Sequence, residues 1–123
     1  MIGVTVLTSM NAEALAETGI TTPVLDQVLR LAQLAQASGL DGVVASPLET
    51  RTIREACGPR FAIVTPGIRG GAATVTGKDD QERTMAAPEA IAAGASYIVV
   101  GRPIIAADDP RGAAQRIAEA RRR

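Results

Sequence analysis

Two arginines in this sequence follow closely on a glycine, and each pair comes at the end of an apolar run. Gly101 and Arg102 directly follow one such run, and Gly67 and Arg69 follow another. A glycine lets a ligand approach the backbone, and the guanidinium group of arginine donates a fork of hydrogen bonds that suits phosphate and carboxylate. The pattern predicts an anion site, and we take phosphate as its ligand.

Few other side chains could do chemistry. The sequence has no histidine, which removes the commonest general base and metal ligand, and its only lysine is Lys78. Thr8 and Ser9 place two hydroxyls after the first apolar run, where they could bond a heterocycle or a sugar, or cap the next helix. Asp108 and Asp109 are interpreted as a helix cap and not as a metal pair. We therefore expect no metal centre.

The composition excludes several classes of partner. Thirteen basic and thirteen acidic residues give a net charge of zero, and one Tyr, one Phe and no Trp leave little to stack on bases, so no nucleic acid is expected. No apolar run approaches the roughly 18 residues that span a bilayer, and no signal peptide is recognisable, so no membrane is expected. The single Cys57 excludes an internal disulfide and fits a cytoplasmic location.

Strand and helix patterns alternate along the chain. The strands are expected at residues 4–10, 42–46, 61–65 and 97–100, and the helices at 11–17, 23–37, 48–57, about 88–93 and from 109 onward. The second helix is the clearest, with Thr22 as N-cap, Pro23 at its first position and Gly39 as its stop. Residues 68–83 are expected to form a long polar loop, and 103–107 a helical turn. Residues 1–123 then make a single domain.

Four consecutive βα units predict an α/β fold with a parallel sheet. Two closures remain, an open doubly wound parallel sheet or part of a (β/α)₈ TIM barrel. A whole barrel takes about 250 residues, and barrels commonly bind phosphate after their seventh and eighth strands. The two glycine-arginine tips follow the last two expected strands. We therefore favour a half barrel equivalent to strands five to eight.

Five strings of residues are distinctive when taken together. They are Leu7-Thr8-Ser9-Met10, Gly-Leu-Asp-Gly-Val-Val at 39–44, Val-Thr-Pro-Gly-Ile-Arg at 64–69, Asp80-Gln81 with Arg83, and Tyr-Ile-Val-Val-Gly-Arg-Pro at 97–103. In this combination the chain resembles the C-terminal half of the orotidine 5′-monophosphate decarboxylases, and the resemblance runs along nearly all of it.

The resemblance implies roles for six residues. The 5′-phosphate would be held by Arg69, Gln81, Gly101 and Arg102. Thr8 and Ser9 would lie against the nucleotide, with Ser9 the partner of the pyrimidine ring. The stretch between Arg69 and Gln81 is longer than is usual in the family.

The catalytic array of the family is not in this sequence. Family members decarboxylate orotidine monophosphate to uridine monophosphate with lysines and aspartates that include an Asp-x-Lys-x-x-Asp motif, without metal or organic cofactor. That motif is absent here, and Lys78 lies in the polar loop. We expect the chain alone to be inactive and to contribute binding. Two alternatives stay open, a noncatalytic phosphate- or nucleotide-binding half barrel and a sugar-phosphate lyase or synthase of the same superfamily.

A four-strand half barrel has two open edges and an apolar inner face, which something must cover. The candidates are a separate N-terminal half barrel, a second copy that closes an eight-stranded barrel by two-fold symmetry, or a flattened arrangement. We favour self-association.

Overall fold

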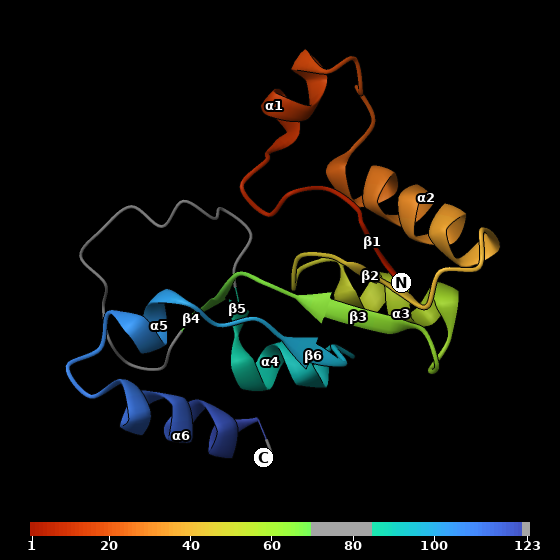
Figure 1. Ribbon diagram of the computed structural model, residues 1–123. Coiled ribbons are helices and arrows are strands. Elements are labelled where there is room, and N and C mark those ends of the chain that lie inside the picture. Colours follow the sequence, from red (N-terminus) through yellow and green to blue (C-terminus); the bar gives the residue numbers. More distant parts are fainter. Residues whose placement is uncertain (70–84, 122–123) are drawn as a thin grey trace.

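The computed structural model describes residues 1–69 and 85–121 (Figure 1). The main sheet has four parallel strands, β1 (Ile2–Val4), β2 (Gly42–Val44), β3 (Ala62–Thr65) and β6 (Tyr97–Ile98), in the order β1-β2-β3-β6. A doubly wound sheet reverses its strand order at a switch point, and the described strands show no such reversal. The order is that of half a (β/α)₈ barrel and speaks against the open doubly wound alternative.

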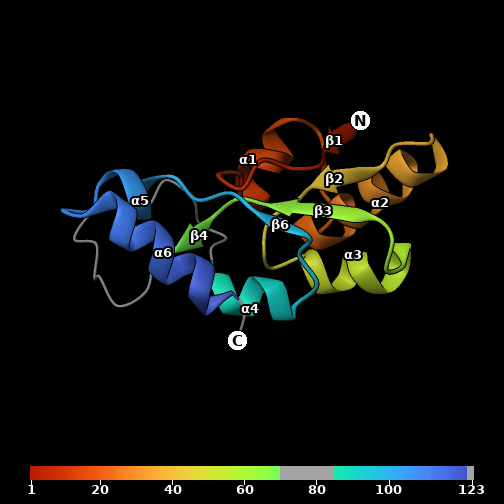
Figure 2. The same cartoon turned by 60° about the horizontal axis from the view of Figure 1, so that its bottom comes forward.

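The helices follow the strands in the expected alternation. They are α1 (Ala12–Glu17), α2 (Val24–Ala37), α3 (Thr50–Cys57), α4 (Ala87–Ala92), α5 (Arg102–Ile105) and α6 (Pro110–Ala120). Figures 1 and 2 show α2, α3 and α4 along one side of the sheet. Helix α6 packs against α4 and α5. Within the described ranges, no helix combines the length and the apolar character that a membrane crossing requires.

The main core lies between the sheet and the helices that cover it. Val28 and Ala35 lie on the buried stripe of α2, as the spacing of its apolar residues predicts. They join Ile53 of α3 and the strand residues Val43 and Ile63 in one cluster of buried side chains. Since alternate residues of a strand point to opposite sides, one side of the sheet supplies this core.

The first strand is shorter than expected. It spans Ile2–Val4, so it begins two residues before the strand expected at residues 4–10 and overlaps that strand only at Val4. Thr5 still bonds to β2, since its backbone N and its Oγ1 both donate to the oxygen of Val44, at 3.1 and 2.8 Å. Beyond that point β2 offers no further strand residue, and the chain turns, with N of Met10 donating to O of Leu7 at 2.9 Å. The apolar run therefore combines a strand with the loop that follows it.

The second helix starts one residue later than expected. Pro23 is its N-cap, with an extended backbone and no side-chain cap, and its oxygen accepts the first helical bond from Gln27. Thr22 therefore stands outside capping reach, and its Oγ1 is buried without a hydrogen-bond partner. The expected stop at Gly39 is confirmed by a φ of +85°, and the expected cap at Asp109 by the bond it accepts from the backbone of α6.

A second, two-stranded sheet was not expected from the sequence. Strand β4 (Ile68–Arg69) pairs in parallel with β5 (Met85–Ala86), where the sequence predicts only loop from residue 68 onward. Ile68 is buried in a second apolar cluster with Ala87 and Ala90. Burial of Ile68 thus holds the start of this segment in place beside α4.

The other side of the main sheet is apolar and largely uncovered. A row of register partners crosses it, formed by Val4, Val44, Val64 and Tyr97. Val4 is 62% exposed and Tyr97 is 64% exposed. Ile2 and Val99, which lie two positions away along their strands, are also exposed. We call these six residues the open face. In a complete barrel this side of the sheet is the packed interior.

Candidate functional site

The carboxyl ends of β3 and β6 lie side by side. Thr65 pairs with Ile98, and N of Val99 donates to O of Thr65 at 2.9 Å. Because the two strands are parallel, the chain leaves both of them at the same end of the sheet. From there β3 leads to β4 and β6 leads to α5. The structure thus brings together the two segments that lead from β3 and β6 to the predicted arginines.

Gly101 and Arg102 form the start of the short helix α5. Gly101 is its N-cap, and its oxygen accepts from N of Ile104 at 2.9 Å and from N of Ile105 at 3.1 Å. The expected helical turn is therefore present. A Cβ on Gly101 would meet no atom within 4 Å, and its φ is −111°. Neither crowding within the protein nor a left-handed backbone requires glycine here, so the space beside its backbone is open to a ligand.

The other predicted phosphate ligands are placed only in part. The backbone of Arg69 pairs with Ala86 between β4 and β5, and Figures 1 and 2 show β4 and α5 at the same end of the main sheet. The backbone of Arg69, in β4, thus lies at the same end of the main sheet as α5, which begins with Arg102. Gln81 lies outside the described residues.

Thr8 and Ser9 lie in the turn that follows β1. The parallel arrangement puts this turn at the same end of the sheet as Gly101 and Arg102, but at the opposite edge, since β1 and β6 are the outer strands. Thr8 is buried and Ser9 is exposed. Of the two hydroxyl residues, Ser9 is the one that solvent, and hence a ligand, reaches freely.

Comparison with known proteins bears on this arrangement. The profile described as "Orotidine 5'-phosphate decarboxylase / HUMPS family" matches residues 1–117. The chain belongs to this family. Its relatives include the orotidine 5′-phosphate decarboxylases of Syntrophotalea carbinolica, with 57% identity over 97% of this chain and 48% of that protein, and of Moorella thermoacetica, with 57% identity over 96% and 46%. The chain spans about half the length of these curated relatives.

Solved decarboxylase structures agree with this half-length match. Orotidine 5′-phosphate decarboxylase from Lactobacillus acidophilus superimposes with a TM-score of 0.81 and 38% identity, over 99% of this chain and 49% of that one. The enzyme from Pyrococcus horikoshii gives a TM-score of 0.69 and 28% identity, over 99% and 50%. The expected family and the half-barrel fold are therefore confirmed.

Beneath the tip of β3, this decarboxylase-family chain buries a polar cluster that the sequence reading missed. Oγ1 of Thr50 lies 3.5 Å from Oγ1 of Thr65 and donates to O of Ser46 at 3.1 Å. Oγ of Ser46 in turn donates to the buried carboxylate of Glu49. The cluster ties the start of α3 to the last residue of β3. Ser46 and Glu49 form an S-x-x-E string, which is the signal that could have located it.

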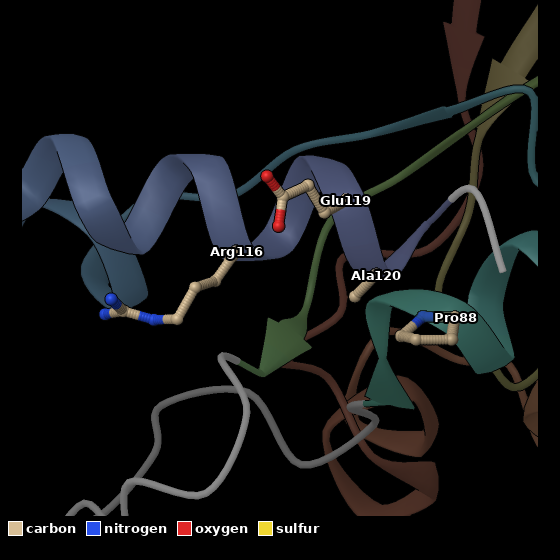
Figure 3. A pocket seen from close by; sticks show the side chains of 4 residues that line it. All are labelled: Pro88, Arg116, Glu119 and Ala120. Carbon is tan, nitrogen blue, oxygen red and sulfur yellow. The ribbon is translucent and has the colours of Figure 1, made fainter.

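One groove lies between α4 and α6. It has a volume of about 420 Å³ and is lined by Pro88 of α4 and by Arg116, Glu119 and Ala120 of α6 (Figure 3). Among the described site residues, Thr8, Ser9, Gly101 and Arg102 do not line it. The described residues also contain no group of three Cys, Asp or Glu side chains that could hold a metal ion. The loops at the ends of β3 and β6 remain the candidate site.

Proposed function

We propose that this chain is the phosphate- and pyrimidine-binding half of an orotidine 5′-monophosphate decarboxylase, equivalent to strands five to eight of the barrel. The observation that carries the proposal is the pairing of β3 with β6, because it brings the two glycine-arginine loops to adjacent strand ends. The last two strands of a barrel commonly build a phosphate site in this way. Both loops belong to this chain, so the phosphate site needs no residue from the rest of a barrel.

Each site residue has a distinct part in this proposal. The guanidinium groups of Arg69 and Arg102 bind the phosphate oxygens, because forked donors suit that geometry. Gly101 lets the phosphate approach the backbone, and Gln81 is a further phosphate ligand. Ser9 contacts the pyrimidine from the turn after β1, at the edge of the sheet opposite β6. Buried Thr8 lies beside it in the same turn and also faces the nucleotide in this proposal.

The chain alone is proposed to bind the nucleotide without decarboxylating it. The lysine and aspartate array that the family resemblance implies has no counterpart in this sequence, whose only lysine is Lys78. Transfer of a proton to C6, the pyrimidine carbon that loses carbon dioxide, therefore needs a second half of the barrel that carries those residues. Binding at the phosphate still serves the reaction, since energy from a remote group can lower the barrier at the reacting carbon. Turnover of orotidine monophosphate by this chain alone would contradict this part of the proposal.

Calorimetry of this chain with uridine monophosphate and with inorganic phosphate tests the binding role. Arg102→Ala should weaken both ligands about tenfold or more, because it removes hydrogen bonds to a charged group. Arg60→Ala is the matched control, since exposed Arg60 precedes β3 at the opposite end of the sheet. It should leave both affinities within about twofold, the change expected of weak long-range charge effects alone. Equal losses in the two variants would show a general charge effect and refute the site.

A sugar phosphate is the second candidate ligand. The family description names HUMPS, the hexulose-phosphate synthases, beside the decarboxylase. It would use the same two arginines, so Arg102→Ala does not separate it from the nucleotide. A contact with the pyrimidine ring does separate the two ligands, because only the nucleotide has that ring. If Ser9 contacts the ring, Ser9→Ala weakens uridine monophosphate and leaves inorganic phosphate unchanged. A chain that binds ribose 5-phosphate as tightly as uridine monophosphate would favour the sugar-phosphate function.

A further inference from the structure

The turn between β2 and α3 buries a carboxylate at the carboxyl end of the main sheet. It comprises residues 46–49, of which only Leu48 is exposed. Ser46 is fully buried, and Glu49 is 3% exposed. A charged group is costly to bury even when it is bound, and a side chain at the surface can cap a helix equally well. The capping of α3 alone therefore does not explain why Glu49 is buried.

Hydrogen bonds hold this turn in place beside β3. Oγ of Ser46 donates to the carboxylate of Glu49. O of Ser46 accepts from N of Glu49 at 3.2 Å and from Oγ1 of Thr50 at 3.1 Å. Oγ1 of Thr50 has a single proton and gives it to Ser46, so the hydroxyl of Thr65 is the donor across the 3.5 Å between the two threonines. The turn thus contacts the last residue of β3.

The turn also lies between the two parts of the proposed site. β2 stands between β1, whose turn carries Ser9, and β3. N of Thr5, at the end of β1, donates to O of Val44 in β2 at 3.1 Å. N of Ala45 donates to O of Val64 in β3, also at 3.1 Å. The chain that enters the turn is therefore bonded to the strand ends on both sides of it.

Thr65 connects the turn with the segments that lead to both arginines. Its Oγ1 contacts Thr50, while its O accepts from N of Val99, three residues before Arg102. Arg69 follows Thr65 by four residues. Thr65 is fully buried, so its hydroxyl cannot meet a ligand from solution. Any effect of this hydroxyl on a phosphate must pass through the segments after β3 and β6.

We propose that Glu49 and Thr50 are positioning residues for the phosphate ligand, a role that rests on the function proposed above. The carboxylate of Glu49 holds Ser46. The carbonyl oxygen of Ser46 orients the hydroxyl of Thr50 beside Thr65, from which the two arginine-bearing segments are placed. Both positioning residues are buried behind the strand ends, so they act on the ligand only through other residues.

Calorimetry with inorganic phosphate and with uridine monophosphate tests the role of Thr50, under conditions in which every variant is fully folded. Thr50→Val should weaken both ligands about fivefold, a coupling typical of residues in one hydrogen-bond network. Thr50→Ser keeps the hydroxyl and should restore most of the affinity. Wild-type affinity in Thr50→Val would overturn the role.

Arg54→Lys is the matched control for a loss of stability. Arg54 lies on the same helix, but it binds the oxygens of Gly58, Phe61 and Gly94, at the end of the sheet opposite the site. The variant should therefore be less stable and still bind both ligands like the wild type. An equal loss of affinity in Arg54→Lys and Thr50→Val would show that binding follows stability and not position, which would refute the proposal.

Glu49 is tested with two variants of its own. Glu49→Ala removes the acceptor of Ser46 and should weaken phosphate as Thr50→Val does. Glu49→Gln keeps an acceptor oxygen and should bind phosphate more tightly than the alanine variant. Wild-type affinity in both would exclude Glu49 from the role.

A double variant separates positioning from a general effect on binding. In Arg102→Ala, the further change Thr50→Val should reduce the affinity for uridine monophosphate by a smaller factor than in the wild type, because one of the positioned arginines is absent. Equal factors would contradict the proposal. If the wild type binds neither ligand, the proposed function fails and the positioning role fails with it. If Arg102→Ala weakens binding and Thr50→Val does not, only the positioning role fails.

Discussion

Arg54 binds the backbone oxygen of Gly94 with two of its guanidinium nitrogens, Nε at 3.1 Å and Nη2 at 2.8 Å. Its Nη1 donates to the oxygens of Gly58 and Phe61 at 2.7 and 2.6 Å, and Nη2 also reaches Oγ of Ser96 at 3.0 Å. One side chain on α3 thus satisfies carbonyl groups in the segments before both β3 and β6. It joins these two βα units at the end of the sheet opposite the candidate site.

Replacement of Arg54 should destabilise the fold. Arg54→Lys keeps the charge but loses the fork, since an ammonium group cannot reach several carbonyls in different directions. We expect the free energy of unfolding in urea to fall by about 2 kcal/mol or more, because partly buried carbonyls lose their donors. Arg51→Lys, at an exposed position on the same helix, should change it by less than about 0.5 kcal/mol. Equal effects would mean that the bonds of Arg54 contribute nothing specific.

Gly94→Ala should also be destabilising. Gly94 has a φ of +112°, and a Cβ there would lie 3.0 Å from Cγ of Arg54. Strain and crowding together should cost about 1–3 kcal/mol in urea unfolding. Gly101→Ala is the contrasting variant, because its Cβ meets nothing within 4 Å. It should leave stability nearly unchanged and weaken phosphate binding in calorimetry. A stable Gly94→Ala protein would contradict the first expectation, and unweakened binding by Gly101→Ala the second.

Thr50→Val tests the buried polar cluster. The variant keeps the shape of the side chain but leaves O of Ser46 without the donor that Oγ1 of Thr50 provides. The expected loss is about 1–2 kcal/mol of unfolding free energy. Thr50→Ser retains the hydroxyl and should recover part of that loss. If valine and serine variants are equally stable, the hydroxyl has no role in stability.

Thr22→Val should stabilise the protein. Oγ1 of Thr22 is buried and makes no hydrogen bond, so its removal ends a desolvation cost without breaking a contact. A gain of about 0.5–1 kcal/mol is expected from thermal or urea unfolding. Thr21→Val, at the exposed neighbouring position, should give no gain. A less stable Thr22→Val variant would show that the hydroxyl has a partner in solution.

Cys57 should react slowly with thiol reagents in the folded protein. Burial raises the pKa of its thiol above the ordinary value of 9.0, and the positive charge of Arg54 opposes this only in part. The raised pKa means that folding favours the neutral thiol. The thiol's contribution to the free energy of unfolding is therefore fully present below pH 9, and it is lost as the pH rises through the pKa that Cys57 has in the folded chain. At pH 8 a disulfide reagent should label the native chain about 100-fold more slowly than the urea-unfolded chain. Equal rates would show that the thiol is accessible.

The sequence predicted the order of strands and helices better than the residues at which they begin and end. Apolar spacing and glycine stops located α2 and the order of strands and helices, since both depend on local patterns. The end of β1 and the pairing of β4 with β5 were missed because both depend on what lies beside them. Residues 68 and 69 look like polar loop until Ile68 is seen buried against α4.

In the candidate site, too, the residue types could be predicted from the sequence, and their neighbours in space could not. Glycine and arginine types pointed to Gly101 and Arg102, but only the strand pairing reveals that their loop adjoins the one leading to Arg69. The hydroxyls of Thr50 and Thr65 carry no distinctive motif between them. Their contact joins positions 15 residues apart and exists only once α3 has packed on β3.

The bond from N of Val99 to O of Thr65 makes the two arginine loops one mechanical unit. Because this bond ties the two strand ends to each other, we expect a ligand that shifts the segment after β3 to shift the segment after β6 as well. The contributions of Arg69 and Arg102 to a shared ligand should then be coupled, and the loss in the double variant should differ from the sum of the single losses. A substitution that moves the segment leading to one arginine should therefore also change the position of the other arginine.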